Sequence, residues 1–445
     1  MTVILFALMA VLELGFMIFE LAKISSKKEW STKRIILNAA EIIVFFAMVL
    51  LPGIDTGFRF TGLIFMLVLR LVVSGIFWLI NRKNLKPKKK VSAVFGAILG
   101  IILILSSMIP AFLFTDYEGL ETTGPYKVSQ ANAILVDRSR TEQFENDGSY
   151  REVPVYFIYP EDAAEKMPLV IFSHGAFGYY QSNSSLFLEL ASHGYVVASI
   201  EHPYHSIFTH DTDGKTIIAD RDFLNDSMTT GTGDKSEAEV FEVTSKWMEL
   251  RTADMNFAID SLKEKNIDSW YIDADQKDGV AKAVSLIDTS RIGLTGHSMG
   301  GATAVTCGRR DDISAVVDID GTMLGENLGV NGDDLIINEE PYHTPLLNLQ
   351  NQNHHDEAVQ ALIDGEAYSN NTIISNADIV YSTYFRNSGH MDFTDLPLFS
   401  PVLAGMLGTG DVNNEEMLNT MNGLVLRFFD CYLKGEGTFE VNEYY

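Results

Sequence analysis

Cysteine is scarce in this chain, which contains only Cys307 and Cys431 in 445 residues. So few cysteines exclude a fold held together by a framework of disulfides, and no Cys-x-x-Cys pair indicates a structural zinc site. The sequence does not decide whether the two cysteines pair, because pairing depends on their distance in the fold. The chain also lacks an internal repeat and a low-complexity linker, and its length allows two or three domains.

Basic residues are scarce after residue 114. Residues 1–114 contain 13 Lys and Arg against 5 Asp and Glu, a net charge of +8. Residues 115–445 contain 20 against 54, a net charge of −34. A domain this acidic repels polyphosphate, so we expect no nucleic-acid partner.

Long apolar runs are confined to the basic first part of the chain. Charged loops separate four runs of at least 17 residues: Thr2–Ala22, Ile35–Leu51, Phe60–Ile80 and Val91–Phe114. A helix needs about 20 residues to cross the hydrocarbon of a bilayer, and only helices satisfy their own backbone hydrogen bonds there. The sequence therefore predicts that residues 1–114 form a membrane domain of four transmembrane helices, with membrane lipid as a partner.

The charge of the loops predicts the orientation of these helices. Residues 23–34 hold five Lys and Arg and residues 81–90 hold six, whereas residues 52–59 hold only Arg59. Under the positive-inside rule the two basic loops are cytoplasmic. We therefore expect a multi-pass protein of the cell membrane whose N-terminus and whole domain after Phe114 are extracytoplasmic. The first run has no basic segment before it, so it does not resemble a cleaved signal peptide.

Four ionisable residues fall within the apolar runs, namely Glu13, Glu20, Glu41 and Arg70. Charged side chains are costly in hydrocarbon and can mark the path of an ion or a substrate. In the alternative interpretation, which we favour, Arg70 pairs with Glu13 or Glu41 to fix the bundle and Glu20 reaches the interface.

Residues 115–445 alternate short β-rich runs with helical stretches. The predicted strands are Val153–Tyr159, Leu169–Phe172, Val196–Ile200, Ile292–Thr295, Ala315–Ile319, Leu346–Leu349 and Ile379–Phe385, and the predicted helices include Ser184–His193, Glu237–Lys265 and Ala302–Arg310. This alternation, with several continuously apolar strands, predicts an α/β domain with a doubly wound, mostly parallel sheet. Residues 205–236 break the alternation and are expected to form a surface excursion near the site.

A G-x-S-x-G motif is the most informative feature of this domain. Gly296-His297-Ser298-Met299-Gly300 follows an apolar strand and precedes a helical stretch. In this context the serine lies on a sharp turn that exposes its hydroxyl as a nucleophile. A β-carbon at Gly296 or Gly300 is expected to crowd the neighbouring backbone.

A serine nucleophile requires a histidine base and an orienting carboxylate, which follow in the chain order Ser, acid, His. We predict His390 as the base because it follows the last predicted strand in a glycine-containing loop. His343 is expected to serve a turn, and His354 and His355, although they suggest a metal beside Asp356, are expected in a solvated loop.

The acid is less clear than the base. Asp318 and Asp320 fall on the same face of a strand, and position at its carboxyl end favours Asp320. Asp356, in the loop after the next strand, is the alternative acid.

Two backbone N–H groups are expected to stabilise an oxyanion. One is that of Met299, directly after the nucleophile, where the N-terminus of a helix favours negative charge. The other is that of Ala176, since Gly175 allows the loop after an early strand to turn its amides inward. The His174 side chain precedes Ser298 and is expected to be structural.

The runs around these residues resemble the platelet-activating factor acetylhydrolases of the α/β-hydrolase superfamily. The likeness is carried by Phe172–Gly178, Leu190–Ala198, Glu201-His202 and Gly296–Thr303. The resemblance implies that the acid follows the strand after the nucleophile helix, which favours Asp320. It also implies a serine carboxylic-ester hydrolase acting on short or oxidised acyl chains of phospholipids, with neither metal nor cofactor.

The four predicted transmembrane helices are a departure from these relatives, which are soluble or lipid-associated, and broader relatives include secreted polyester and lipid hydrolases. We therefore predict an esterase for lipid or other amphiphilic short-acyl esters. The alternatives are a peptidase or amidase with the same triad, and a membrane sensor or transporter with a non-catalytic outer domain.

Overall fold

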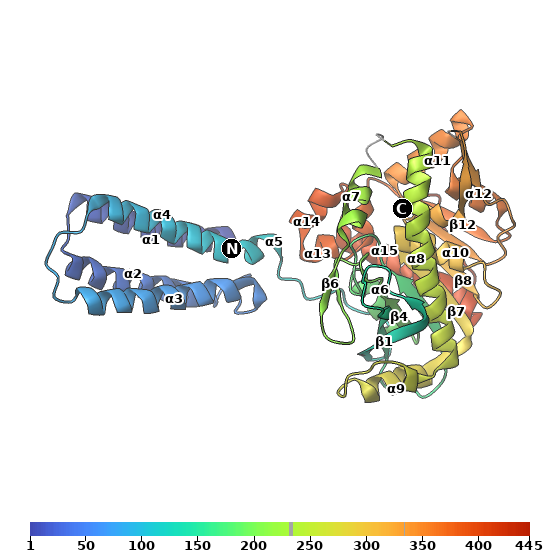
Figure 1. Ribbon diagram of the computed structural model, residues 1–445, viewed down its shortest axis with the longest axis horizontal. Coiled ribbons are helices and arrows are strands. Elements are labelled where there is room, and N and C mark those ends of the chain that lie inside the picture. The colour runs from blue at the N-terminus through green and yellow to red at the C-terminus, as the bar shows by residue number, and fades with distance from the viewer. Residues whose placement is uncertain (231–234, 333) are drawn as a thin grey trace. The chain divides into compact units, whose positions relative to one another are not determined.

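The structure is a computed structural model that describes residues 1–230, 235–332 and 334–445. The chain divides into two compact units (Figure 1). The first, here called the helical unit, comprises Met1–Glu118 and Leu398–Leu403. The second, here called the sheet unit, comprises Gly119–Pro397 and Ala404–Tyr445.

Four long helices lie side by side in the helical unit, followed by one short helix (Figure 1): α1 (Thr2–Ala22), α2 (Lys27–Met48), α3 (Phe58–Asn81), α4 (Lys90–Ser107) and α5 (Ile109–Leu113). Within the described residues, α1, α3 and α4 are long and apolar enough to cross a membrane. Three of the four predicted spans therefore lie in helices that are long and apolar enough to cross a membrane. The predicted span Ile35–Leu51 lies in α2, which begins at Lys27 and includes six charged residues, so α2 as a whole is much less apolar.

The ionisable residues of these helices are paired. Arg70 forms ion pairs with both Glu13 and Glu41, and the Nη1 atom of Arg34 lies 2.6 Å from Oε2 of Glu13. Removing one partner would leave an uncompensated buried charge, which is far more costly than the pair itself. This arrangement confirms the structural interpretation of Arg70, because its contacts hold α1, α2 and α3 together.

Glu20 is buried near the end of α1. It contacts Nζ of Lys33 at 3.2 Å and the Ser25 hydroxyl at 2.9 Å. Residues of the first basic loop and of α2 thus enclose its carboxylate, and its position at a membrane interface stays a prediction.

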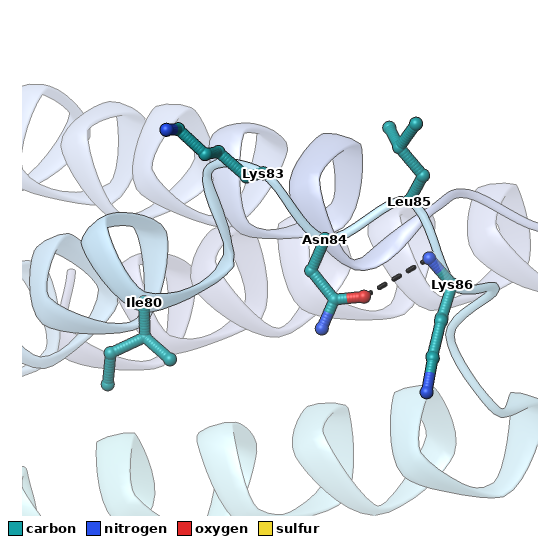
Figure 2. A pocket seen from close by; sticks show the side chains of 5 residues that line it. All are labelled: Ile80, Lys83, Asn84, Leu85 and Lys86. Atoms are coloured by element: carbon teal, nitrogen blue, oxygen red, sulfur yellow. Dashed lines mark hydrogen bonds between the residues drawn. The ribbon is translucent and has the colours of Figure 1, made fainter.

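An open hollow of about 600 Å³ lies at the loop between α3 and α4 (Figure 2). Its lining residues are Ile80, Lys83, Asn84, Leu85 and Lys86. Oδ1 of Asn84 accepts a hydrogen bond from the Lys86 backbone N–H at 3.1 Å, which shapes the turn. None of the predicted site residues lines this hollow.

The sheet unit is built on a sheet of eight strands: β1 (Val128–Thr141), β2 (Tyr150–Pro160), β3 (Met167–Ser173), β4 (Val196–Ile200), β7 (Ile287–His297), β8 (Ala315–Ile319), β11 (Leu346–Asn351) and β12 (Val380–Phe385). Their order is β1-β2-β4-β3-β7-β8-β11-β12. The pairs from β4 to β12 are parallel, and β1 and β2 are antiparallel to their neighbours. The predicted mostly parallel sheet is confirmed.

All seven predicted strands are present in this sheet, and β1 is its one strand that was not predicted. The four short strands described outside it were not predicted either: β5 (Phe208–His210), β6 (Thr216–Ile218), β9 (Asn327–Asn331) and β10 (Asp334–Ile337). Strand β1 lies at the edge of the sheet and pairs only with β2. An edge strand is partly solvated and therefore carries polar residues, as in Ser129-Gln130 and Asp137-Arg138, which obscure its apolar pattern.

Helices cover both faces of the sheet. On one face α8 (Glu237–Glu264), α9 (Lys277–Leu286) and α10 (Met299–Cys307) contribute to the main apolar core, and α6 (Ser184–Ser192) and α15 (Asn414–Phe429) lie on the other (Figure 1). The remaining elements, apart from short turns and the short strands, are α7 (Arg221–Thr230), α11 (Gln352–Asp364), α12 (Ser369–Asn376), η3 (His390–Phe393), α13 (Leu396–Phe399) and α14 (Pro401–Leu407). Both cysteines are free, Cys307 in the core and Cys431 half-buried.

The parallel strands determine where a site can form. The carboxyl ends of β3, β7, β8, β11 and β12 meet at one edge of the sheet, where α/β proteins hold their ligands. The predicted site residues lie in the loops and helices that follow these strands.

Candidate active site

Ser298 lies on a sharp turn between β7 and α10. Its φ and ψ are 58° and −127°, a conformation that costs a non-glycine residue about 1–3 kcal/mol. The turn is held on both sides, because the Ser298 N–H donates to the Ile319 carbonyl at 2.8 Å and the Ser298 carbonyl accepts from the Ala302 N–H at 3.1 Å. The strand, turn and helix predicted for the G-x-S-x-G motif are therefore present, and Ser298 remains partly exposed.

Both outer glycines of the motif are required because neighbouring backbone atoms leave no room for a β-carbon. A β-carbon at Gly296 would lie 2.3 Å from the carbonyl carbon of Gly300, and one at Gly300 would lie 1.9 Å from the Ser173 carbonyl oxygen. Both distances are far below van der Waals contact. The expected crowding at these two positions is confirmed.

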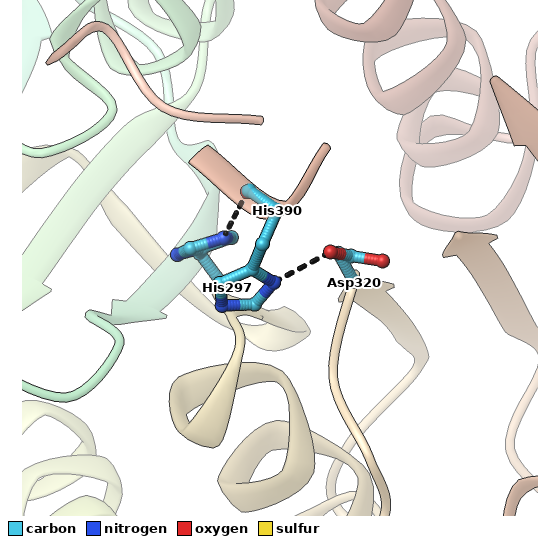
Figure 3. Close-up of side chains that lie close together, drawn as sticks. All are labelled: His297, Asp320 and His390. Carbon is cyan, nitrogen blue, oxygen red and sulfur yellow. Dashed lines mark hydrogen bonds and ion pairs between the residues drawn. The ribbon is translucent and has the colours of Figure 1, made fainter. Parts of the chain in front are cut away.

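His390 contacts Asp320 at the same edge of the sheet (Figure 3). Nδ1 of His390 lies 2.6 Å from Oδ2 of Asp320, a short distance typical of a charge-assisted hydrogen bond. His390 begins the short helix η3 after β12, and Asp320 directly follows β8 with a φ of 56°. The structure thus brings together two residues predicted as base and acid that are far apart in the sequence.

Four donors surround the buried Asp320 carboxylate. Besides His390, it accepts hydrogen bonds from Nδ1 of His354 at 2.9 Å and from the Asn351 backbone N–H and Nδ2, both at 2.7 Å. Burial alone would raise the pKa of Asp320, but the hydrogen bonds from His354 and His390 hold it below its usual range. Asp320 is therefore a stable anion that can orient an imidazole.

The two other candidate acids lie elsewhere. Asp318 is fully buried, and burial together with the charge of Asp320 raises its pKa well above the usual range, which disfavours its charged form. Its Oδ1 accepts the Gly321 N–H at 3.0 Å and supports the turn after β8. Asp356 is exposed on α11, where it accepts a hydrogen bond from Gln352 at 3.0 Å, and it makes no contact with His390 among the described residues.

His390 contacts the residue before Ser298, but no hydrogen bond joins it to Ser298 among the described residues. The Ser298 hydroxyl makes no hydrogen bond within the part of the chain that the structure describes, whereas the adjacent His297 ring lies 4.6 Å from the His390 ring, centroid to centroid. Nε2 of His297 donates to the His390 carbonyl at 3.1 Å, which ties the His390 loop to the elbow. Hydrogen bonds between a catalytic serine and its base are often long before substrate binds.

The loop after β3 closely approaches the elbow. A β-carbon at Gly175 would lie 3.1 Å from Cβ of Ser298. Neither the Ala176 N–H nor the Met299 N–H donates a hydrogen bond to any described residue. Two unused donors beside the serine are what an oxyanion site requires, although their distance to a substrate oxygen stays a prediction.

An apolar cluster adjoins these amides. Phe223 of α7, Trp247 and Met248 of α8, and Met299 and Ala302 of α10 form it, and Ala176 and Phe177 pack against it. The Phe177 and Phe223 rings lie 4.9 Å apart, centroid to centroid. The described part of the predicted excursion 205–236 therefore does reach the site, whereas residues 231–234 lie outside the described residues.

The sequence analysis missed Arg251, which anchors the loop after β3. This fully buried guanidinium donates from Nη1 to the His174 carbonyl and from Nη2 to the Gly175 carbonyl, the latter at 3.3 Å. Turning both carbonyls towards α8 leaves the following Ala176 amide free. Burial lowers the pKa of Arg251 to about 9. No local pattern marks an arginine on a long helix for this role.

His174 is buried beneath the same loop. Its Nε2 contacts the Ser206 hydroxyl at 2.9 Å and accepts the His202 N–H at 3.3 Å, and burial holds its pKa well below the usual range. These contacts lie away from Asp320, as expected for a structural residue.

The other histidines differ from expectation in one respect. His343 is exposed and contacts Asp378 at 2.8 Å, in agreement with a turn. His354 and His355, expected in a solvated loop, instead lie in the first turns of α11, where His354 contacts Asp320 and His355 stacks on Tyr384 with centroids 3.8 Å apart. The expectation was wrong because β11 ends at Asn351 and a helix begins at once.

Donor atoms of His297, Asp320 and His390 lie within 4.8 Å of one another. Two histidines and a carboxylate are ligands that suit several divalent metals. However, a hydrogen bond already joins Nδ1 of His390 to Oδ2 of Asp320, so these two atoms are not both available to a metal ion while that bond persists. That the site works without a metal stays a prediction.

Comparison with known proteins identifies relatives of the sheet unit. Residues 145–442 match the family described as platelet-activating factor acetylhydrolase, isoform II. Platelet-activating factor acetylhydrolase of Cavia porcellus is 27% identical over 164 residues, 35% of this chain and 34% of the relative. That of Canis lupus familiaris is 25% identical over 307 residues, 63% of this chain and 60% of the relative.

Two further relatives extend the comparison. A probable 1-alkyl-2-acetylglycerophosphocholine esterase of Arthroderma benhamiae is 28% identical over 169 residues, 37% of this chain and 35% of the relative. The chain thus spans 34% to 60% of the length of these three relatives. The structure of a ferulic acid esterase from Streptomyces cinnamoneus has a TM-score of 0.52 and 20% identity, covering 72% of this chain and 93% of that one, which supports the fold.

The family match covers more than half of the chain and includes Ser298, Asp320 and His390. The sheet order and the strand, turn and helix around Ser298 agree with it. The chain therefore belongs to the platelet-activating factor acetylhydrolase isoform II family of α/β hydrolases.

Proposed function

We propose that this protein is a membrane-associated serine hydrolase that cleaves short-acyl carboxylic esters of lipids or other amphiphiles. The observation that carries the proposal is the 2.6 Å contact between His390 and the buried anion Asp320, beside a strained serine. A buried carboxylate with four donors serves to hold an imidazole in one orientation and tautomer.

The proposed reaction proceeds in two steps through an acyl-enzyme. Ser298 Oγ attacks the acyl carbonyl carbon and His390 Nε2 takes the hydroxyl proton, while Asp320 stabilises the imidazolium. His390 then gives this proton to the leaving alcohol oxygen as the ester bond breaks. In the second step water repeats the attack with His390 as base, which releases the acid and restores the Ser298 hydroxyl.

The amides of Met299 and Ala176 are proposed to hold the oxyanion of each tetrahedral intermediate. One such donor is worth about 3–4 kcal/mol of transition-state stabilisation in comparable sites. The free state of both N–H groups supports this role, since no internal acceptor has to be displaced.

A lipid-like substrate is supported by three observations. The relatives are named for a phospholipid acetyl ester, the apolar cluster around Phe223 and Trp247 adjoins the proposed oxyanion donors, and the same chain carries helices fit to cross a bilayer. We propose that α2 completes a four-helix membrane domain, residues 1–114. The basic loops would then face the cytoplasm, and residues 115–445 would face outward.

The test compares the purified full-length protein with its Ser298→Ala variant on p-nitrophenyl esters from acetyl to octanoyl. We expect the variant to lose at least about 1,000-fold in kcat, because the oxyanion donors alone retain little rate. Ser375→Ala, an exposed serine on α12 that bonds only to its own helix, serves as the matched control. Undiminished turnover by Ser298→Ala would reject the proposal.

The same experiment separates the alternatives. Peptide p-nitroanilides measured beside the esters would reveal a peptidase or amidase, because the triad chemistry is common to both bonds. A non-catalytic sensor or transporter would show no Ser298-dependent labelling by a fluorophosphonate probe. Preference for acetyl over octanoyl esters would support an acetylhydrolase rather than a lipase.

A further inference from the structure

The Asp320 carboxylate is shared by two imidazoles rather than one. His390 contacts Oδ2 at 2.6 Å and His354 contacts Oδ1 at 2.9 Å, each through Nδ1. The His354 and His390 rings lie 5.6 Å apart, centroid to centroid, in an edge-to-face arrangement. The reaction proposed above gives a role to His390 only, so the second imidazole requires its own explanation.

His354 is held in place by the start of α11. Asn351 caps this helix, since its Oδ1 accepts the His354 backbone N–H at 2.8 Å while its Nδ2 donates to Asp320. Asn351 and His354 therefore fix both oxygens of Asp320, and Oδ2 accepts from Asn351 Nδ2 as well as from His390. The positive end of the helix also favours the anion.

His354 can exchange a proton with solvent. Its Nε2 makes no hydrogen bond to any described residue, and 23% of its side chain is exposed. Burial acts to lower the pKa of His354, but the hydrogen bond and charge of Asp320 raise it above the usual value. The titratable or charged groups that face it are Asp320 after β8, His390 in η3, His297 at the end of β7, Glu357 on its own helix and Tyr368 before α12.

We propose that His354 is a positioning residue that shares the Asp320 carboxylate with His390, and that proton binding at its free Nε2 suppresses the hydrolytic reaction. The proposal rests on the proposed function, because it assumes that His390 is the base. A protonated His354 adds a positive charge beside Asp320. That charge opposes the imidazolium that forms on His390 in the transition state.

The direction of the expected pH effect follows because a positive charge on His354 opposes the positive charge that forms on His390. At alkaline pH His354 is neutral, donates only a hydrogen bond and leaves the rate unaffected. As the pH falls, His354 takes up a proton and the reaction slows. A variant that keeps the donor but cannot ionise should therefore remain active to lower pH.

The test uses His354→Asn, because Nδ2 of asparagine occupies the place of Nδ1 of histidine and donates to Asp320 without a titrating ring. The full-length protein is assayed on p-nitrophenyl acetate, and the rate of Ser298 labelling by a fluorophosphonate is measured in parallel, both from pH 5 to 9. We expect kcat/KM of His354→Asn at pH 8 to stay within about threefold of the unmodified protein. Towards acid pH its normalised rate should exceed that of the unmodified protein by about three- to tenfold.

His354→Ala removes the donor as well as the charge. Its rate should lie about tenfold below that of His354→Asn at every pH, because the anion loses a hydrogen bond, and its acid limb should therefore move with that of His354→Asn. His355→Asn is the matched control, since His355 stacks on Tyr384 and should keep the original pH profile.

An acid limb that is the same in His354→Asn and in the unmodified protein would overturn the inference while Ser298-dependent activity still supported the proposed function. Labelling and turnover that do not depend on Ser298 would overturn both. A merely structural histidine would lower the rate equally at all pH values without moving the limb.

Discussion

Two aspartates separated by one residue have pKa values shifted in opposite directions because their neighbours differ. Asp320 receives four hydrogen bonds and has a lowered pKa, whereas Asp318, equally buried, receives one from Gly321 and has a raised pKa. The charge of Asp320 itself contributes to raising the pKa of Asp318. At the scale of the residue, the number of donors rather than burial decides which carboxyl can orient a base.

Asp395 provides a residue-scale prediction about pH. It follows η3 and ties the His390 loop to α6, because its carboxylate accepts the Ser185 N–H at 2.7 Å and the Ser185 hydroxyl at 2.6 Å. Burial raises the pKa of Asp395 to about 6, although the hydrogen bonds from Ser185 act against this. The folded state therefore favours the protonated carboxyl, and its free energy of unfolding falls as the pH rises from about 4 to 6.

Asp395→Asn should remove this penalty. A difference of about 2 in pKa corresponds to about 3 kcal/mol, so the variant should gain up to that much unfolding free energy over the unmodified protein between pH 4 and pH 7. Denaturant unfolding followed by fluorescence measures it, with the exposed Asp364→Asn as control. A stability difference that does not change with pH would contradict the assignment.

At the scale of the element, the site depends on how tightly a strand, a turn and a helix pack. The elbow places α10 against the end of β3, and α11 begins directly after β11, so the N-termini of two helices lie at the same sheet edge. One supplies the Met299 amide and the other supplies Asn351 and His354. The N-termini of two helices, rather than the strands themselves, therefore bring the Met299 amide, Asn351 and His354 to the candidate site.

Gly300→Ala tests the packing of the elbow. The added β-carbon would lie 1.9 Å from the Ser173 carbonyl oxygen, so β3 and α10 must separate. We expect a loss of about 1–3 kcal/mol in unfolding free energy, together with a large loss of esterase rate, because Ser298 moves relative to Ala176.

Gly423→Ala on α15 is the matched control. Its β-carbon would meet only Nη1 of Arg427, at 3.6 Å. Alanine favours a helix by about 0.8–1 kcal/mol over glycine. This control should therefore become slightly more stable and keep its activity, and equal effects at the two glycines would argue against the tight elbow.

At the scale of the whole molecule, the number of membrane crossings decides which side the sheet unit faces. Three helices meet the length and hydropathy for crossing, and α2 has an apolar second half after a charged first half. Four crossings put the two ends of residues 1–114 on the same side, whereas three put them on opposite sides. The basic loops favour the arrangement with the sheet unit outside.

Cysteine labelling measures this orientation. In a Cys431→Ser background, Asp364→Cys on α11 should react with an impermeant maleimide on intact cells. Lys83→Cys, in the loop between α3 and α4, should react only after lysis. Protection of both residues, or labelling of Lys83→Cys alone, would reverse the proposed topology.

Much of the fold could be predicted from local patterns. Most of the seven predicted strands are continuous or near-continuous apolar runs, and α1 begins and ends where its apolar run does, because burial on both faces and a bilayer both demand unbroken hydrophobicity. The edge strand β1 and the charged start of α2 escaped prediction because both are partly solvated. Their polar residues interrupt the regular pattern of apolar residues from which strands and membrane-spanning helices are predicted.

The sequence by itself determined the strained serine turn, because a tight turn requires glycine at the two positions around Ser298 for local steric reasons. Chain order also supplied His390 and Asp320 as candidates. Only the tertiary structure decided that His354 joins Asp320 across 34 residues of chain and that Arg251 anchors a loop 77 residues before it. Hydrogen bonds of this kind depend on which distant elements contact each other in the fold, and neither composition nor periodicity predicts those contacts.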